Sequence, residues 1–368
     1  MEHALVQQRP VKTYPRLGAE VSLGPVPDRL VEELPALYGS LFSTGDWFRI
    51  FDEVTPGGSC ILSDPRHVLL FHQKGDTVDV LNKAFAIAPT DAARACRALF
   101  DALPRARRIH LEVMFPPAEL HAPKRVLYSA EDMVVDLHGS PDAYYSSLGK
   151  KTRKNVRNMD NRLRRAQPDV TTEIVQVGDR ASELVGQFLT WHLARAKERG
   201  FVSGYVSKPK QAAQTTELVR AGAEAQLTSI GGRLAAIEFI FYVGPDANLY
   251  AGSFDAAYGD LNLGFLSTYW ALRETARRGA RRCHLLWGTD YYKTLLGARP
   301  ERATRLSVFR SQTARLHSLD EAREVAVRDA RRRGQRDYWR ARHAAGRLVR
   351  RYRREQPGPD RDGADGAA

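Results

Sequence analysis

The stretch from Asn248 to Lys293 holds the residue types and spacing that are most open to chemistry. It is expected to form a strand at 248–254, a loop that contains Gly259 and Gly264, and then an amphipathic helix. A strand that leads through a loop to a helix N-terminus presents free backbone N–H groups, which can bind a phosphate. A plain strand-to-helix connection is the alternative interpretation of the same pattern.

A lone carboxylate is the second chemical feature. Glu238 lies on the strand expected at 234–243, and strand alternation places it on one face with Ala236, Ile240 and Tyr242. A carboxyl among apolar neighbours should have a raised pKa, as a general base requires. A rim glutamate paired with an arginine is the alternative.

Other polar side chains recur at helical spacing or at a strand end. His192 and Arg195 lie three residues apart and are expected to face one cleft together, although a structural histidine stays open. Arg153 and Arg157 lie four apart, a spacing suited to a phosphate or a carboxylate. Asp255 directly follows a strand, where it is expected to serve as a base, to orient an amine or to cap a helix.

The composition excludes several classes of protein. No Walker A sequence, HExxH, GxSxG or EF-hand loop occurs, so P-loop hydrolysis, zincin and α/β-hydrolase chemistry have no support. The three cysteines are scattered without a CxxC pair, so neither a disulfide framework nor a metal site is expected. No signal peptide and no apolar run of about 18 residues is found. The sequence therefore predicts a cytoplasmic protein without a metal.

The positive charge is concentrated in two segments. Of the formal net charge of +13, residues 150–165 and 318–355 each contribute +7, so the rest of the chain is close to neutral. A charged helix face in solvent would explain either segment alone. Two such segments favour an anionic partner, which a phosphorylated cofactor, an RNA such as tRNA or an anionic membrane surface would provide. With the membrane as partner, the protein would lie peripherally at the inner membrane surface.

The elements that must position these residues follow a mixed order. Helices, strands and turns alternate as α-β-β-β-α-β-α-β after about residue 180, which favours a layered α+β sheet. The expected elements are a helix at 28–40, strands at 59–62, 68–72 and 77–81, a helix at 90–103, strands at 108–113 and 132–137, a helix at 141–166, a strand at 170–177, helices at 180–199 and 208–222, strands at 225–230, 234–243 and 248–254, a helix at 262–278, a strand at 282–287, a short helix at 290–296 and a strand at 305–309.

Three motifs in order give the sequence a recognisable pattern. They are YYSSLGKKTRKNVRNMDNRLRR at 144–165, FLTWHLARAKERGF at 188–201, and SFDAAYGDLNLG with the later WGTDYYK ending at Lys293. Together they resemble the Fem-like branch of the GCN5-related N-acetyltransferase (GNAT) superfamily, in particular the acetyltransferase family with CelD-type proteins. The resemblance covers about residues 132–309. One departure is that Asp260-Leu261-Asn262-Leu263-Gly264 replaces the family's small residue-Pro-Gly.

The resemblance implies a fold of tandem GNAT-like lobes. A degenerate N-terminal lobe would span residues 1–130 and an acyltransferase domain with a mixed sheet flanked by helices would span 131–317. A basic amphipathic helix at 318–355 and a disordered tail at 356–368 would follow.

The resemblance also implies roles for individual residues. Acyl-CoA would bind between the strands at 248–254 and 282–287. Tyr292 would be the acid for the departing thiolate and Lys293 would stabilise the charge of the tetrahedral intermediate, although a packed tyrosine and a surface lysine stay open. Contacts to the cofactor are expected from Phe254, Gly259, Asn262 and Gly264, and contacts to the substrate from Tyr144, Arg153, Arg157, His192 and Arg195.

The function that follows is acyl transfer from acetyl-CoA or another acyl-CoA to an amine. The acceptor would be a small molecule, a peptide, or a precursor of the cell envelope or of a secondary metabolite. A Fem-like aminoacyltransferase that uses aminoacyl-tRNA is the first alternative, and the basic segments suit RNA phosphates. A degenerate acyltransferase that serves as a scaffold is the second.

Overall fold

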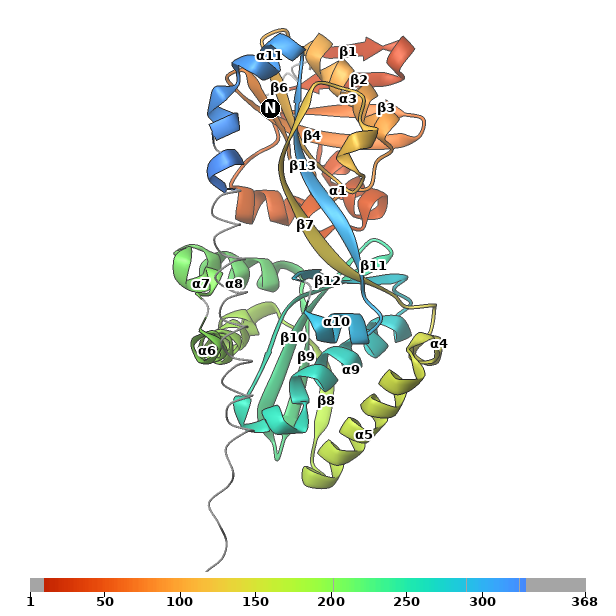
Figure 1. Cartoon of the computed structure of the whole chain (residues 1–368), viewed down its shortest axis with the longest axis vertical. Helices are drawn as coiled ribbons and strands as arrows, with labels where there is room; N and C mark the ends of the chain where they lie inside the picture. The colour runs from red at the N-terminus through yellow and green to blue at the C-terminus, as the bar shows by residue number, and fades with distance from the viewer. Residues whose placement is uncertain (1–9, 201, 289, 324, 329–368) are drawn as a thin grey trace, which may run out of the picture. The chain divides into compact units, whose positions relative to one another are not determined.

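The computed structural model describes residues 10–200, 202–288, 290–323 and 325–328 (Figure 1). The chain divides into a compact unit that ends at Arg315 and a second that begins at Leu316. The elements below belong to the first unit, apart from the end of α11 (Gln312–His317). The basic helix expected at 318–355 lies largely outside the described residues, and the tail expected at 356–368 lies wholly outside them.

All thirteen strands of the described residues form one mixed sheet, which two lobes share. The first lobe contributes β1 (Val11–Tyr14), β2 (Ala19–Leu23), β3 (Gly58–Ser63), β4 (Arg66–Lys74), β5 (Thr77–Val80) and β6 (Arg108–Val113). The remaining strands are β7 (Lys124–Asp136), β8 (Thr171–Gln176), β9 (Glu224–Ile230), β10 (Arg233–Val243), β11 (Asp246–Phe254), β12 (Arg282–Trp287) and β13 (Arg299–Phe309).

Helices cover both faces of this sheet. The first lobe has α1 (Asp28–Tyr38), α2 (Gly45–Trp47) and α3 (Pro89–Ala102). The second lobe has α4 (Pro141–Ser147), α5 (Lys150–Ala166), α6 (Ala181–Arg199), α7 (Gly204–Ser207), α8 (Gln211–Gly222), α9 (Leu263–Arg277) and α10 (Tyr291–Leu295). On β10, Ile237, Phe239 and Phe241 pack in the apolar core that α6 and α8 cover, whereas Ile240 packs with α9. Alternation along β10 therefore decides which side chains can reach a site on the α9 face.

The two lobes exchange strands at the centre of the sheet. The strand order is β1-β2-β3-β4-β5-β6-β13-β7-β12-β11-β10-β9-β8. Thus β13, which follows the second lobe in the chain, pairs with β6, whereas β7, which follows β6, pairs with β12. β7 and β13 also pair with each other, and Figure 1 shows both as long strands that run from one lobe to the other. The fold is therefore α+β, with a mixed sheet flanked by helices, as expected.

Each lobe contains one parallel strand pair. In the first lobe β5 and β6 pair over Thr77–Asp79 and Arg108–His110, and a bridge between Phe85 and Val113 joins the chain again beyond this point. Between them Asn82 is fully buried, and its side chain bonds to the backbone of β4. The chain beyond β5 thus stays attached to both neighbouring strands of the first lobe.

Most expected elements are confirmed, with four differences. The strands expected at 132–137 and 305–309 are longer than predicted, because β7 begins at Lys124 and β13 begins at Arg299. The helix expected at 141–166 is two helices, because α4 ends at Ser147 and α5 begins at Lys150. Its expected start is confirmed: Ser140 accepts a hydrogen bond from the amide of Ala143, and Pro141 is the first helical residue. The strands β1 and β2 had no counterpart among the expected elements. Asp28 and Thr90 lie within the first turns of α1 and α3, where Pro27 and Ala88 hold the cap positions.

Candidate active site

The second lobe keeps its strand gap open. β11 and β12 pair in parallel only from Asp246 to Asn248 and from Arg282 to His284. Beyond Asn248, β11 pairs with β10 alone, so its other edge has no strand partner. Backbone N–H and C=O groups on such an edge can bind an extended ligand in the way a further strand would.

Glu238 lies beside this open edge. The residue is 8% exposed, and its carboxylate accepts a hydrogen bond from the Thr268 hydroxyl of α9 at 3.0 Å. Burial raises the pKa of Glu238 to about 7, although hydrogen bonds from Thr268 and Ser267 act in the opposite direction. The carboxyl is therefore close to half ionised at neutral pH, which suits a general base.

Gly252 makes room for the Glu238 carboxyl. The two residues are partners across β10 and β11, and a Cβ atom at Gly252 would lie 2.0 Å from Oε2 of Glu238. Gly252 is itself exposed, because β12 has already diverged from β11 at this position. The absence of a side chain thus opens the strand edge toward the carboxyl.

We expect Gly252→Ala to lower kcat by roughly 10–100-fold while CoA binding stays within about threefold, because the new methyl group must displace the candidate base. Gly222→Ala is the matched control, since a Cβ atom there meets no atom within 4 Å. Steady-state kinetics together with CoA titration measure both effects. Unchanged kcat in Gly252→Ala would mean that the position of Glu238 does not matter.

Three further expected residues lie around Glu238. Arg195 of α6 and Lys293 of α10 are both close enough to stabilise its ionised form, and Glu238 in turn raises the pKa of Tyr292. Burial is the main cause of the raised pKa of Tyr292, so its hydroxyl holds its proton at neutral pH. A base, a protonated phenol and two cations thus lie close enough to influence one another electrostatically.

Lys293 has a specific structural contact. It is 5% exposed, and its ammonium donates to the backbone carbonyls of Leu285, Leu286 and Trp287 at 2.8, 3.3 and 2.9 Å. Burial lowers its pKa. Because an ammonium has three N–H groups, these contacts use all of its donors to fix the end of β12. Its expected role at the tetrahedral intermediate stays a prediction.

The residues expected to contact the cofactor surround the start of α9. The Phe254 ring covers Gly264 so closely that a Cβ atom there would lie 2.2 Å from the ring. Asn262 adopts a left-handed backbone (φ 60°) and its carbonyl accepts the amides of Phe265 and Leu266. Gly259 lies just before this turn, and its carbonyl accepts the Asn262 amide. Their contact with a cofactor stays a prediction.

Several expected site residues have structural contacts elsewhere. Tyr144 is fully buried, and its hydroxyl donates to the carbonyl of Leu296 at 3.1 Å, so it belongs to the core rather than to a substrate surface. Arg153 donates to the carbonyls at the end of α4, those of Ser146 and Leu148. It therefore stabilises the break between α4 and α5.

Three other expected site residues have contacts within the protein: Arg157, Asp255 and His192. Arg157 is exposed and lies 3.5 Å from the Tyr145 hydroxyl. Asp255 caps the 3-10 helix at Ala256–Leu261 by accepting the amide of Ala257 at 2.9 Å. His192 contacts the hydroxyl of Ser203 at 2.9 Å, and burial lowers its pKa, so it is neutral at pH 7.

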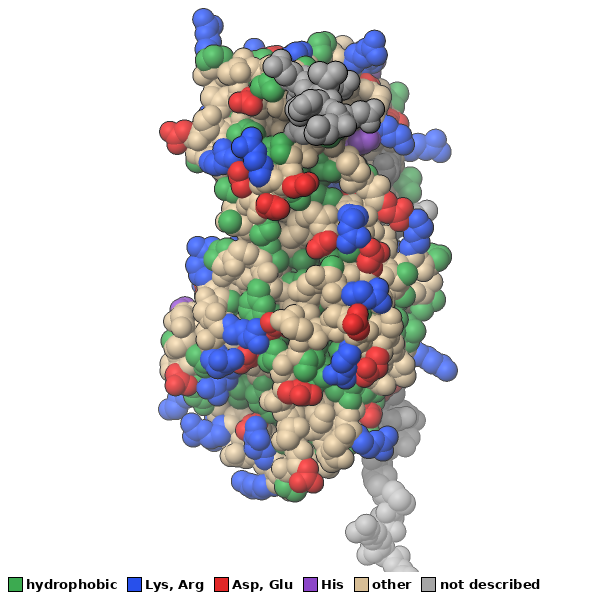
Figure 2. Space-filling model, turned by 180° about the vertical axis from the view of Figure 1, so that it is seen from behind, with side chains coloured by type: hydrophobic (Ala, Val, Ile, Leu, Met, Phe, Trp, Pro, Cys, Tyr) green, Lys and Arg blue, Asp and Glu red, His purple; other side chains and the backbone are tan. Residues whose placement is uncertain are grey.

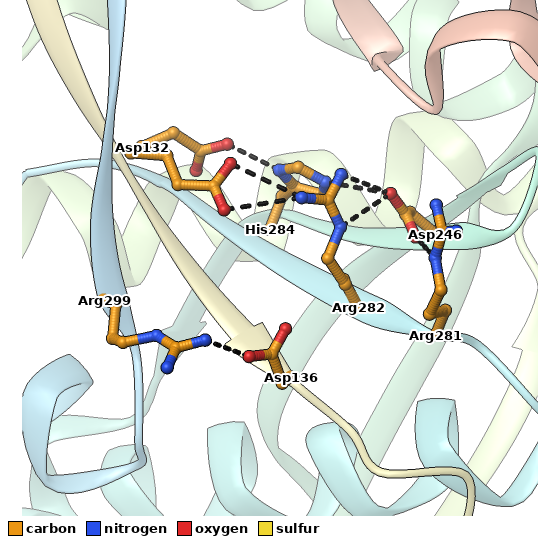
Figure 3. A network of polar contacts seen from close by, with 8 residues as sticks. Asp132, Asp136, Asp246, Arg281, Arg282, His284 and Arg299 are labelled. Atoms are coloured by element: carbon orange, nitrogen blue, oxygen red, sulfur yellow. Dashed lines mark hydrogen bonds and ion pairs between the residues drawn. The ribbon is translucent and has the colours of Figure 1, made fainter. Parts of the chain in front are cut away.

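A buried ionic network at the base of the strand gap had no counterpart in the sequence analysis (Figure 3). Nδ1 of His284 on β12 lies 2.6 Å from Asp132 of β7, and its Nε2 lies 3.5 Å from Asp246 of β11. Arg282 donates to Asp246 at 2.8 Å. The network joins three strands at the last paired position of β11 and β12. A histidine in the apolar strand 282–287 was its signal in the sequence.

Helix α5 carries several exposed basic residues. Lys151, Lys154, Arg162 and Arg165 all face solvent. The face in Figure 2 carries basic and acidic side chains intermixed rather than one continuous basic surface. Binding of tRNA or an anionic membrane by the basic segments stays a prediction.

Two further features concern the described residues: the absence of a group that could hold a metal ion and the absence of a helix that could span a membrane. No group of three or more His, Cys, Asp or Glu side chains in this part of the chain is placed to hold a metal ion. None of the described helices has the length and apolar character that crossing a membrane requires.

Comparison with known proteins places this site in a family. The model for the acetyltransferase (GNAT) domain matches residues 150–294, a range that includes Glu238, Arg195, Tyr292 and Lys293. Residues 150–294 therefore form a GNAT acetyltransferase domain. Within this GNAT domain, both strands of the open gap are present, whereas β7 and β13 lie outside the matched range.

Solved structures with similar folds extend the likeness to both lobes. The crystal structure of FemX is 11% identical, covers 80% of this chain and 97% of its own, and has a TM-score of 0.56. A conserved protein of unknown function from Bacteroides thetaiotaomicron is 11% identical, covers 82% and 100%, and has a TM-score of 0.52. At this identity the likeness concerns the fold, so the GNAT domain has a Fem-like architecture. A search of curated proteins finds no match.

Proposed function

We propose that this acyltransferase moves an acyl group, acetyl in the simplest case, from a CoA thioester to an amine of a small molecule or a precursor of the cell envelope or of a secondary metabolite. The observation that carries the proposal is the open edge of β11 beside Glu238, whose pKa is about 7. An extended pantetheine arm can pair with such an edge, and the thioester then lies beside the base.

The residues around the gap supply both proton transfers. Glu238 accepts a proton from the amine, whose nitrogen then forms the new C–N bond to the thioester carbon. Backbone N–H groups on the open edge of β11 can stabilise the developing oxyanion. When the C–S bond breaks, Tyr292 donates its proton to the thiolate. Lys293 binds the carbonyls at the end of β12, which fixes this side of the gap for the donor.

Binding of CoA tests the proposal. Calorimetric titration should detect CoA, and thiol release should depend on an added amine. The Fem-like fold and the exposed basic residues of α5 favour a second candidate, transfer from aminoacyl-tRNA. If the protein binds charged tRNA at near-physiological salt and does not bind CoA, the acyl-CoA proposal is wrong and the second candidate replaces it.

Tyr292→Phe should lower kcat with acetyl-CoA by roughly 10–1000-fold, because the thiolate then leaves without its proton. The loss should shrink with an aryl thioester analogue, whose thiolate is a better leaving group. Tyr291→Phe is the matched control, because the adjacent Tyr291 is 76% exposed. An equal loss with both thioesters would remove Tyr292 from the proton transfer.

A further inference from the structure

The guanidinium of Arg195 is half-buried and has no hydrogen bond or ion pair with another described residue. It lies over the Phe254 ring, whose centroid is 5.0 Å away. The carboxylates of Glu238 and Asp290 influence its pKa, yet neither lies within the 4.0 Å of an ion pair. Since buried charges are normally paired, an unpaired guanidinium at a catalytic site indicates a missing anion.

The surrounding structure holds Arg195 in place. Helix α6 carries four side chains at helical spacing, so they lie on one face from the core to the helix end: Phe188, His192, Arg195 and Arg199. Phe188 is buried, and His192 packs against it and contacts Ser203. The aromatic ring of Phe254 supports the guanidinium from the other side. Arg195 is therefore preorganised, and little entropy is lost when a ligand binds.

The positive charges of Arg195 and Arg199 also favour the binding of an anion between them. Burial lowers the pKa of Arg195, and the neighbouring Arg199 lowers it further. Arg199 is exposed, with no ion pair to another described residue. Two cations side by side repel each other, and a carboxylate or phosphate between them would relieve that repulsion.

We propose that Arg195 binds a carboxylate or phosphate of the acceptor, so that the acceptor is an amine with an acidic group close to its nitrogen. This inference rests on the proposed function. In a pantetheine arm that extends along β11, the phosphates of CoA are more than ten bonds from the thioester sulfur beside Glu238. We therefore assign the anion at Arg195 to the group that reacts; a CoA phosphate at Arg195 would instead raise KM for acetyl-CoA in Arg195→Gln.

Matched acceptors test the inference. Wild-type protein is assayed by thiol release with amino acids against their carboxamides, and with phosphoethanolamine against ethanolamine, which separates a carboxylate from a phosphate. The variants are Arg195→Gln and Arg195→Lys, and circular dichroism confirms their fold. Arg180→Gln is the control, because Arg180 lies at the other end of α6 and pairs with Glu183.

We expect wild type to prefer one anionic class by at least tenfold in kcat/KM. Arg195→Gln should raise KM for that acceptor by roughly 10–100-fold relative to KM for its neutral partner, because any change in the ionisation of Glu238 affects both acceptors equally, and KM for acetyl-CoA should stay within about threefold. Arg195→Lys should recover part of the loss. Calorimetry with CoA present should show weaker binding of the anionic amine to Arg195→Gln.

Two results would overturn the inference without touching the proposed function. One is equal turnover of anionic and neutral amines by the wild type. The other is an Arg195→Gln effect that appears only when acetyl-CoA is replaced by succinyl-CoA, because the anion would then belong to the acyl group. By contrast, absence of both CoA binding and acyl transfer to any amine would contradict the proposed function itself.

Discussion

Glu238→Gln should lower kcat/KM at pH 7 by roughly 100–1000-fold, because the amide cannot accept the proton of the attacking amine. In the wild type, kcat/KM should rise with pH through about 7, where the buried carboxyl ionises. This low-pH limb should be absent from the residual activity of the variant. Glu198→Gln on the exposed side of α6 is the control.

The same substitution should stabilise the protein above pH 7. A glutamate whose folded-state pKa is raised from 4.5 to about 7 contributes stability below pH 4.5 and loses it as the pH rises to 7. The ionised form therefore costs about 3 kcal/mol in the folded state. Glu238→Gln avoids this cost, so its free energy of unfolding at pH 8 should exceed that of the wild type. Lower activity with lower stability would instead indicate a merely structural glutamate.

Thr268→Val should change the pKa of Glu238 while the carboxyl group itself stays in place. The Thr268 hydroxyl donates to the Glu238 carboxylate and lowers its pKa. Without this donor the low-pH limb should move to higher pH, while kcat well above the limb stays within about threefold of the wild-type value. A limb that does not move would assign it to another group.

Local patterns in the sequence were sufficient for most elements and for the strand face on which Glu238 lies. Strand alternation placed Glu238 on the face of Ala236 and Ile240, and the structure packs both of these residues on the α9 side. The strands at 108–113 and 282–287 have the predicted bounds. These predictions succeed because the period of a strand depends only on neighbours in the chain.

Contacts between distant segments were beyond the sequence. His284 and Asp132 are 152 residues apart, and nothing local joins them. The strand exchange of β7 and β13 likewise depends on tertiary pairing. Tyr144 and Arg153 carry the family motif, yet they fix α4 against α10 and α5. A motif therefore identified the family, whereas contacts were needed to separate structural from functional residues.

His284→Gln should destabilise the protein by about 3–5 kcal/mol at pH 6, because it removes the cation that two buried carboxylates share. Asp132 and Asp246 are 3% and 1% exposed. Burial alone would lower the pKa of His284, but its contacts as a donor to Asp132 and Asp246 outweigh burial and raise the pKa to about 9. Asp246 keeps the support of Arg282, whereas Asp132 loses its bonded cation.

The pH dependence distinguishes this ionic role from simple packing. A raised histidine pKa contributes stability that is full below pH 6.5 and is lost as the pH rises through about 9. The difference in unfolding free energy between wild type and His284→Gln should therefore shrink by about 3 kcal/mol from pH 6 to pH 10. Urea denaturation at several pH values measures it, with His121→Gln on the exposed surface as control. A difference that stays constant over this range would mean that His284 is neutral and acts by packing.

The ionic network holds β7, β11 and β12 at the point where the gap opens. A destabilised variant should therefore also bind CoA more weakly, which links the buried charges to the width of the site.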